Sequence, residues 1–341
     1  MGDDPALAER AALVLSEDLG QLDPTHTLER TRASAEEALR RLQGLGDDAG
    51  IVQATITLSR MAFYHGHCTR SLEITDELLE HARELPYSAR RTIALDRVIC
   101  GYFGPAPVDE ALRIHERALA IVSDSVIAQA LLGEVHAALL AMQGKDEEFR
   151  VEQERVDRLM DEIGLPELLS NTYQGRGEAE RFLGHLDRAE QQFRRGVEQW
   201  DALGETGFNS TITALLAWVL CDLERFEEAE ANVDRSRVLS SDDDFASQAA
   251  WRMAQARVLS HREQHDEALR LADEALAINE RTDYLAWQAE SDEVRGMVLT
   301  AAGRPDEAQE AYDRALERFE RKGVVPAVGR VRARIGELLG Q

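Results

Sequence analysis

A short pattern recurs about every 40 residues along this chain of 341 residues, and a period of that size restricts the fold more than any other feature. A small side chain near the start of a predicted helix marks each unit. The marked positions are Thr31, Ser71, Ala111, Phe149, Ala189, Ala229, Ala268 and Ala308, in steps of 40, 40, 38, 40, 40, 39 and 40 residues. Self-similarity at a fixed period indicates stacked supersecondary units, so the sequence predicts a solenoid.

The last unit shows how one repeat is built. Gly303 follows the first predicted helix of the unit, and glycine tolerates a positive φ at a helix end. Pro305 suits the first turn of the next helix, where a missing N–H costs little. Ala308, Tyr312 and Ala315 then follow at helical spacing, which places them on one face. We expect the small residues to let two helices approach closely and Tyr312 to fill the space between them.

Small residues also occur twelve positions before the repeat marker, in the partner helix. These positions are Ser59, Ile99, Ala137, Gly177, Ala217, Ala256 and Gly296, and six of the seven are small. Two small positions that face each other permit tight antiparallel packing of a helix pair. Phe149 is the exception among the markers. Two interpretations of it are open: the packing adjusts locally around a bulky residue, or the superhelix bends there and forms a hinge.

These residues resemble the tetratricopeptide (TPR) repeat, which has a small residue in its first helix and Ala, aromatic, Ala in its second. The resemblance is carried by Gly296, Gly303, Ala308, Tyr312 and Ala315, and by Gly177, Gly184, Ala189 and Phe193. The period exceeds the roughly 34 residues of the standard repeat, and the standard early Trp and late Pro are mostly missing. Such long units are similar to the TPR-like sensor regions of bacterial signalling ATPases of the maltose-activator type and of multidomain nucleotide cyclases.

The resemblance implies an all-α fold, an α-α superhelix of about eight helical hairpins. We expect one domain over residues 1–341, with a first hairpin at 5–42, seven further hairpins at 43–322 and a capping helix at 325–340. In the first hairpin, helices are expected from Leu7 to Leu19 and from Thr25 to Leu42. The capping helix alternates apolar and basic residues: Val328, Val331, Ile335, Leu338 and Leu339 with Arg330, Arg332 and Arg334.

The charge balance argues against several classes of partner. The net charge is −25 and the pI is near 4.8. Nucleic-acid binding depends on Lys and Arg that neutralise phosphates, so neither DNA nor RNA is an expected partner. The same argument disfavours anionic membrane surfaces. Lys145 and Lys322 are the only lysines, which we interpret, with the Ala-rich helices, as the coding bias of a high-GC bacterium.

Other sequence features predict a cytoplasmic protein. Cys68, Cys100 and Cys221 are odd in number and widely spaced, so they form no disulfide framework. The acidic N-terminus lacks a signal peptide, and no apolar stretch approaches the roughly 20 residues needed to span a bilayer. The chain opens directly into its first hairpin, as a fragment or a stand-alone relative of a sensor region would.

Candidate catalytic and metal sites are few. His65, His67 and Cys68 could supply ligands for zinc, but they lie where other repeats carry the turn between helices. We interpret them as turn residues. His261 and His265 are four apart, but a helix end separates them, so they would not share a face. The sequence shows no phosphate-binding loop, GxSxG elbow or zincin helix. We therefore expect no enzymatic activity, no cofactor and no metal.

In TPR-like stacks, the first helices of the pairs line the concave face. The register of the repeat places fourteen groove candidates there: Gln53, Arg60, Tyr64, Asp96, Glu134, Asn171, Gln174, Glu178, Arg181, Trp218, Met253, Arg257, Glu290 and Glu293. Phe63, Phe103 and Phe182 occupy similar positions and either line the groove or pack between helices. The family's carboxylate clamp is not expected, because Arg60, Arg181 and Arg257 lie in separate repeats.

The mixed chemistry of these positions suits an extended peptide, with apolar anchors in pockets and polar groups that set its register. Our first hypothesis is a non-catalytic protein–protein interaction scaffold that binds a peptide or protein segment in the concave groove. The alternative is a regulatory, ligand-sensing region of a signal-transduction ATPase, cyclase or transcription regulator. The acidic chain makes a basic or mixed-charge partner the expected one by electrostatic complementarity.

Overall fold

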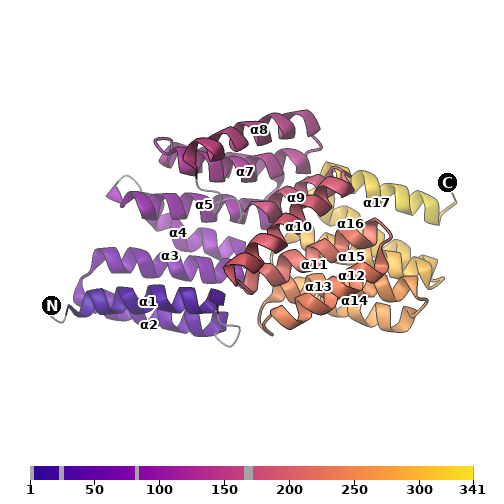
Figure 1. Ribbon diagram of the computed structural model, residues 1–341, viewed down its shortest axis with the longest axis horizontal. Helices are drawn as coiled ribbons and strands as arrows, with labels where there is room; N and C mark the ends of the chain where they lie inside the picture. Colours follow the sequence, from indigo (N-terminus) through magenta and orange to yellow (C-terminus); the bar gives the residue numbers. More distant parts are fainter. Residues whose placement is uncertain (1–3, 23–26, 81–83, 165–171, 341) are drawn as a thin grey trace.

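The computed structural model describes residues 4–22, 27–80, 84–164 and 172–340. Over these ranges the chain forms eight antiparallel helix pairs and a final single helix (Figure 1). The pairs are α1 (Pro5–Leu22) with α2 (Leu28–Leu45), α3 (Asp48–Tyr64) with α4 (Cys68–Glu80), α5 (Tyr87–Phe103) with α6 (Val108–Ile121), α7 (Val126–Met142) with α8 (Asp146–Ile163), α9 (Tyr173–Phe182) with α10 (Leu186–Leu203), α11 (Gly207–Asp222) with α12 (Phe226–Leu239), α13 (Phe245–His261) with α14 (His265–Asn279), and α15 (Leu285–Ala301) with α16 (Pro305–Lys322), followed by α17 (Val325–Leu338).

The predicted all-α superhelix is confirmed. In Figure 1, α1–α8 form one half of the molecule, α11–α16 form the other, and α9 and α10 cross between them. Helices α1 and α2 extend to Leu22 and Leu45, beyond the expected ends, and the expected start at Thr25 lies outside the described residues. Within the described ranges, no helix combines the length and the apolar character needed to cross a membrane.

The repeat markers are buried between the helices of each pair. All eight lie in the second helix of a pair, and each is almost fully shielded from solvent. An added Cβ on Gly296 would lie 2.6 Å from the ring of Tyr312, and one on Gly177 would lie 2.4 Å from the ring of Phe193. The expectation that an aromatic side chain fills the space left by a small residue is therefore confirmed. Close packing leaves no room for even one methyl group there.

Phe149 is buried in α8. Ala137, twelve residues earlier in α7, is also fully buried and belongs to the same hydrophobic core. A small partner residue next to a bulky marker supports local adjustment of the packing. The alternative, a hinge at this repeat, stays a prediction.

The turns inside six of the pairs, α3–α4 and from α7–α8 to α15–α16, share one geometry, whereas the α5–α6 turn differs because Gly104 has φ = −69°. Gly303 has φ = 70° and α16 begins at Pro305, as the sequence predicts. Gly184 occupies the same turn position with φ = 82°. In the α11–α12 and α13–α14 turns this position is held by Glu224 and Glu263, each with φ = 60°. A left-handed conformation is costly for a residue with a side chain, so these two turns are strained relative to the glycine ones.

The superhelix closes on itself after 215 residues, which is between five and six repeats. Asp243, in the α12–α13 connection, accepts a hydrogen bond from the backbone N–H of Leu28 at 2.9 Å. Asp283, in the α14–α15 connection, accepts hydrogen bonds from the N–H groups of Cys68 and Thr69, both at 2.8 Å. The ends of the N-terminal helices thus rest on connections of the C-terminal half, and the concave face becomes an interior.

Lys322 makes the third of these closing contacts. Its side chain is fully buried, and its Nζ donates hydrogen bonds to the carbonyl oxygens of Gly101, Gly104 and Ala106 at 2.9, 2.7 and 2.9 Å. Those carbonyls lie at the end of α5 and in the turn that follows it. Three acceptors match the three donors of an ammonium group.

Candidate binding site inside the superhelix

An aromatic cavity of about 710 Å³ occupies the interior that closure creates. Every first helix from α3 to α15 supplies at least one residue to its wall. Nine aromatic residues line it and define what we call the aromatic cavity: Phe63, Tyr64, Tyr102, Phe103, Trp200, Phe208, Phe245, Tyr284 and Trp287. The ring of Tyr284 stacks on that of Phe103, with centroids 5.2 Å apart, and on that of Phe63, with centroids 5.8 Å apart. The volume lies within the roughly 300–1,000 Å³ of typical ligand pockets.

The ionisable residues of this wall are mostly acidic. They are Arg60, Asp96, Glu134, Glu178, Glu205 and Asp244. Asp96 lies 3.5 Å from Arg60, and Glu134 is paired with Arg176. Glu205 accepts the N–H of Gly207 at 2.8 Å at the start of α11, and Asp244 accepts the N–H of Ser247 at 3.1 Å at the start of α13. Four of the five acids therefore have a structural partner that accounts for their charge.

Glu178 is the exception among these acids. Its side chain is buried, with 3% exposure, and its Oε2 accepts a hydrogen bond from the Tyr102 hydroxyl at 3.3 Å. Gln174 and Trp287 also donate hydrogen bonds to it. Burial raises the pKa of Glu178 to about 7, although the charge of Arg181 opposes the rise. In the part of the chain that the structure describes, no basic group lies within ion-pair distance of this carboxyl.

A second, charged cavity of about 430 Å³ lies between α9, α11, α13, α15 and α17. Its wall carries four arginines and three acids: Arg181, Arg257, Arg330, Arg334, Asp222, Glu290 and Glu293. Arg257 contacts Asp222 at 2.7 Å, and Arg181 is paired with Glu290. Arg330 and Arg334 both contact Glu293, at 2.7 and 3.0 Å. Burial raises the pKa of Glu293, but Arg330 and Arg334 outweigh it and bring the pKa to about 2. This cavity is a network of compensated charges.

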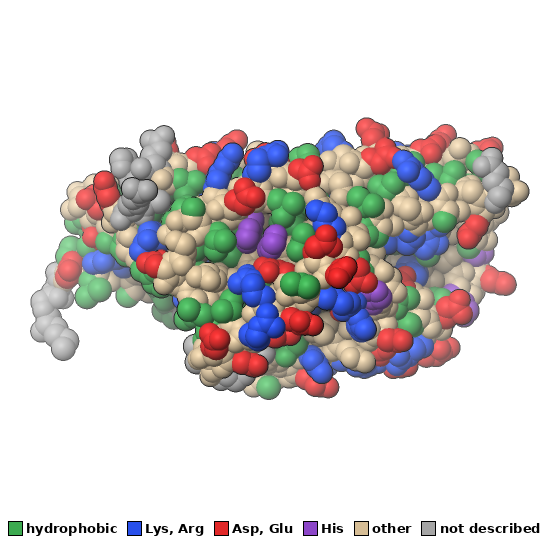
Figure 2. All heavy atoms as spheres, turned by 90° about the horizontal axis from the view of Figure 1, so that it is seen from above, with side chains coloured by type: hydrophobic (Ala, Val, Ile, Leu, Met, Phe, Trp, Pro, Cys, Tyr) green, Lys and Arg blue, Asp and Glu red, His purple; other side chains and the backbone are tan. Residues whose placement is uncertain are grey.

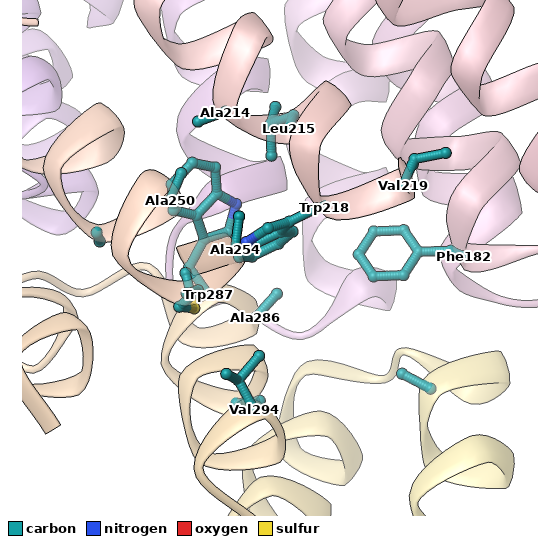
Figure 3. Close-up of a cluster of buried hydrophobic side chains, with 14 of the residues drawn as sticks. Phe182, Ala214, Leu215, Trp218, Val219, Ala250, Ala254, Ala286, Trp287 and Val294 are labelled. Carbon is teal, nitrogen blue, oxygen red and sulfur yellow. The ribbon is translucent and has the colours of Figure 1, made fainter. Parts of the chain in front are cut away.

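Trp218 lies between the two cavities. Its side chain is 3% exposed, and the guanidinium of Arg181 lies 4.9 Å from the centre of its ring. Figure 3 shows the rings of Trp218 and Trp287 next to each other, with Phe182 facing them from α9. The packing of these rings separates the aromatic cavity from the charged one.

The structure gathers eleven of the fourteen predicted groove residues around these two cavities. Arg60, Tyr64, Asp96, Glu134, Gln174 and Glu178 line the aromatic cavity. Arg181, Trp218, Arg257, Glu290 and Glu293 line the charged one. Gln53 is half-buried and Met253 fully buried, and neither lines a cavity; Asn171 lies outside the described residues. That these residues bind a partner stays a prediction.

Closure brings together arginines that the sequence keeps apart. Arg181 and Arg257 lie in separate repeats, in α9 and α13, and line one cavity together with Arg330 and Arg334 of α17. The expected closing helix is present, with Val331 fully buried, but two of its arginines point inward to Glu293. Their spacing in the sequence does not report that the turn of the superhelix brings them together.

Several cavity residues were missed by sequence reasoning. Phe208, Phe245 and Tyr284 lie at the starts of α11, α13 and α15, in steps of 37 and 39 residues. Their recurrence near the repeat period is a signal that could have found them. Phe63 and Phe103 were expected either to line the groove or to pack between helices. They do both, because their rings contact each other and also line the cavity.

The histidine pairs lie as the register predicts. Tyr64 ends α3 and Cys68 begins α4, so His65 and His67 belong to a turn, and Nδ1 of His65 lies 2.8 Å from the Met61 carbonyl oxygen. His261 ends α13 and His265 begins α14. Among the described residues, no group of three or more His, Cys, Asp or Glu is arranged to hold a metal ion.

The outer surface contrasts with these interior sites. On the face that Figure 2 shows, acidic and basic side chains are interspersed with hydrophobic ones, and neither charge gathers into a separate patch. Many of the exposed pairs are local, such as Arg270 with Glu267 in α14. Exposed pairs of this kind contribute little to stability.

Comparison with known proteins supports the class of the fold. Residues 187–334 match the family model of the tetratricopeptide repeat-like domain. Among solved structures, a chain of the APC/C hetero-tetramer Cut9–Hcn1 is similar with a TM-score of 0.58 and 11% identity, over 97% of this chain and 56% of its own length. BtubC from P. vanneervenii is similar with a TM-score of 0.44 and 20% identity, over 67% of this chain and 91% of its own. No protein of curated function matches the sequence.

The match to the tetratricopeptide repeat-like family covers residues 187–334, and the fold of the described chain is a TPR-like α-α superhelix. The chain spans little more than half the length of the Cut9–Hcn1 chain that it resembles.

Proposed function

We propose that this chain is a non-catalytic interaction scaffold that binds a short segment of a partner protein in the aromatic cavity. One observation carries the proposal: all seven first helices from α3 to α15 contribute to a single aromatic-lined cavity. Aromatic side chains dominate the energetics of protein interfaces, because they bury large areas at low entropic cost. A wall collected from seven repeats is a binding surface that no single repeat provides.

The size of the cavity limits the occupant. A volume of about 710 Å³ suits a few side chains of an extended segment and excludes a long helix. The matched chain of the APC/C hetero-tetramer Cut9–Hcn1 comes from an assembly with a protein partner, which supports a protein partner for this chain as well. The acidic wall favours a segment of basic or mixed charge.

Gly175 offers a direct test of this proposal. It lies in α9, lines the aromatic cavity, and has open space where a Cβ would stand. Gly175→Phe therefore introduces a ring into the wall of the cavity from a Cβ that meets no atom within 4 Å, and it removes a glycine from a helix, which favours the fold. Gly329 is an exposed glycine of α17 with the same open space, so Gly329→Phe is the matched control.

A library of random seven-residue peptides displayed on phage would be selected on the immobilised full chain. The affinities of the enriched peptides would then be measured by calorimetry on the wild type and both variants. We expect binding to Gly175→Phe to be at least about tenfold weaker than to the wild type, with Gly329→Phe unchanged. Equal affinity for Gly175→Phe would place binding outside the cavity, and a selection that enriches no peptide would exclude a peptide-binding scaffold.

A second candidate function is the ligand-sensing region of a larger signalling ATPase, cyclase or transcription regulator. The cavity volume favours it, because it equals that of many small-molecule sites. A metabolite mixture that raises the thermal stability of the wild type but not of Gly175→Phe would support this function. Equal stabilisation of the wild type and of Gly175→Phe would contradict it.

A further inference from the structure

The carboxyl group of Glu178 lies in the wall of the aromatic cavity without an ion-pair partner among the described residues. Its hydrogen-bond donors, Tyr102, Gln174 and Trp287, are all neutral. The charge of Arg181, on the same helix, favours the carboxylate, but the guanidinium is ion-paired with Glu290 of α15. A buried carboxylate is unfavourable unless a cation pairs with it, so this position is complementary to a positive charge that the chain does not supply at ion-pair distance.

The rings around Glu178 reinforce the same preference. Tyr102 and Trp287 both contact the carboxyl group, and the ring of Phe103 lies against each of them, with centroids 4.8 Å and 6.4 Å away. The faces of aromatic rings carry partial negative charge and attract ammonium and guanidinium groups. Both these ring faces and a carboxyl group without an ion-pair partner disfavour an anion in the cavity.

The two cavities differ in this respect. In the charged cavity, each of the acids Asp222, Glu290 and Glu293 has an arginine partner. In the aromatic cavity the other acids are already engaged: Glu134 pairs with Arg176, and Glu205 caps α11. Asp244 caps α13 in the same way. Within the described ranges, Glu178 is therefore the one acid of the aromatic wall with neither an ion pair nor a helix N-terminus to compensate its charge.

We infer that Glu178, Tyr102 and Trp287 form a subsite for the cationic side chain of a Lys or Arg on the partner segment. The aromatic cavity then recognises a basic residue flanked by an apolar one: the carboxylate and the ring faces hold the cation, and the remaining rings hold the apolar neighbour. This inference rests on the proposed function, because it names the chemistry of the segment that enters the cavity.

Three small probes of nearly the same shape test the subsite: 2-phenylethylammonium, 2-phenylethanol and phenylacetate. Their binding to the full chain would be followed by calorimetry and by the fluorescence of Trp200 and Trp287, which line the cavity. We expect the cation to bind at least about tenfold more tightly than the alcohol, and the anion to bind most weakly. Equal affinity for the three probes would overturn the inference.

Variants assign the effect to the carboxyl group. Glu178→Gln keeps the shape of the side chain and should reduce the affinity for the cation to that for the alcohol. Glu154→Gln, in an exposed part of α8, removes the same charge from the chain and should have no effect. Tyr102→Phe keeps the ring and should weaken cation binding only in part. Cation affinity that survives Glu178→Gln would overturn the subsite.

The outcomes also separate this inference from the proposed function. If the alcohol binds the wild type and not Gly175→Phe, while the cation binds no better than the alcohol, the cavity is a binding site and only the cationic subsite is wrong. If no probe binds in a way that Gly175→Phe abolishes, and the peptide selection also enriches nothing, both proposals are overturned. Selected peptides that lack a basic residue would contradict the subsite alone.

Discussion

Asp283 caps the N-terminus of a helix that begins with Cys68, although 215 residues separate the two. Its two carboxylate oxygens accept the N–H groups of Cys68 and Thr69, the first two residues of α4. A helix N-terminus carries unpaired N–H groups and a partial positive charge, both of which a carboxylate satisfies. Lys322 has the opposite role at the C-terminal end of α5, where its ammonium group donates hydrogen bonds to carbonyl groups that have no partner within the helix. The superhelix is thus closed by charges of the sign that each helix end requires.

The first prediction concerns this closure. Asp283→Ala removes two charge-assisted hydrogen bonds and leaves the N–H groups of Cys68 and Thr69 without acceptors. We expect the free energy of unfolding to fall by about 1–3 kcal/mol. Urea denaturation followed by circular dichroism measures this change. Asp242→Ala is the control, because Asp242 is an exposed residue of the neighbouring connection. A loss no larger than that of the control would show that Asp283 does not hold the superhelix closed.

The second prediction concerns the contact between the helices of a pair. Gly296→Ala places a methyl group 2.6 Å from the ring of Tyr312, so the pair must separate or the ring must move. We expect a destabilisation of about 1–3 kcal/mol from overpacking. Gly329→Ala, at an open helical position, should instead stabilise the fold by about 0.5–1 kcal/mol. Thermal unfolding measures both effects. A lower melting temperature for Gly296→Ala and a higher one for Gly329→Ala would support the packing argument, and a stabilising Gly296→Ala would contradict it.

The third prediction concerns the strained turns. Glu224 and Glu263 have φ = 60°, where Gly184 and Gly303 occupy the same turn position in other pairs. Replacement of either Glu by Gly relieves the strain of a side chain in the left-handed region. We expect each variant to raise the free energy of unfolding by about 0.5–1 kcal/mol. The reverse change, Gly184→Ala, should lower it by a similar amount. If Gly184→Ala instead raised the free energy of unfolding, the turns with Glu would not be strained.

The fourth prediction concerns the pH dependence of stability. Because burial raises the pKa of Glu178 from 4.5 to about 7, the folded chain keeps this proton where the unfolded chain has lost it. The contribution of Glu178 to stability therefore falls as the pH rises from about 4.5 to about 7 and is constant above that range. The total change is on the order of 3 kcal/mol.

Glu178→Gln removes this titration. The variant should gain stability relative to the wild type at pH 8, and the gain should be much smaller at pH 5. Urea denaturation of both proteins at the two pH values gives the comparison. A difference between the two proteins that is the same at pH 5 and at pH 8 would show that burial does not raise the pKa of this carboxyl.

The architecture of a single repeat could be predicted from the sequence because its contacts are local. The spacing of Ala308, Tyr312 and Ala315 places them on one helix face, and Gly296 lies close enough along the chain to meet Tyr312 across one turn. The turn residue Gly303 and the helix start at Pro305 follow from backbone preferences alone. The same register placed most of the groove candidates on the first helices.

The site itself could be predicted only in part. Glu178 and Tyr64 were placed on the concave side by register, but Tyr284 and Trp287, which come from a repeat five to six units away from α3 and α5, were not connected with them. Nothing in the local pattern distinguishes Glu178, which is held by neutral donors, from Glu134, which is paired with Arg176. That difference depends on which residues of other repeats reach each carboxyl.

The stack of helix pairs follows from the amino-acid sequence alone, because the period, the small residues and the turn glycines act within about 40 residues of one another. The closure of the stack after 215 residues, and the aromatic cavity inside it, are evident only from the folded chain. Closure arises because the small rotation between successive pairs adds up over five to six repeats. The angle of each rotation depends on side-chain packing between neighbouring pairs, and it cannot be predicted from the periodicity of the sequence.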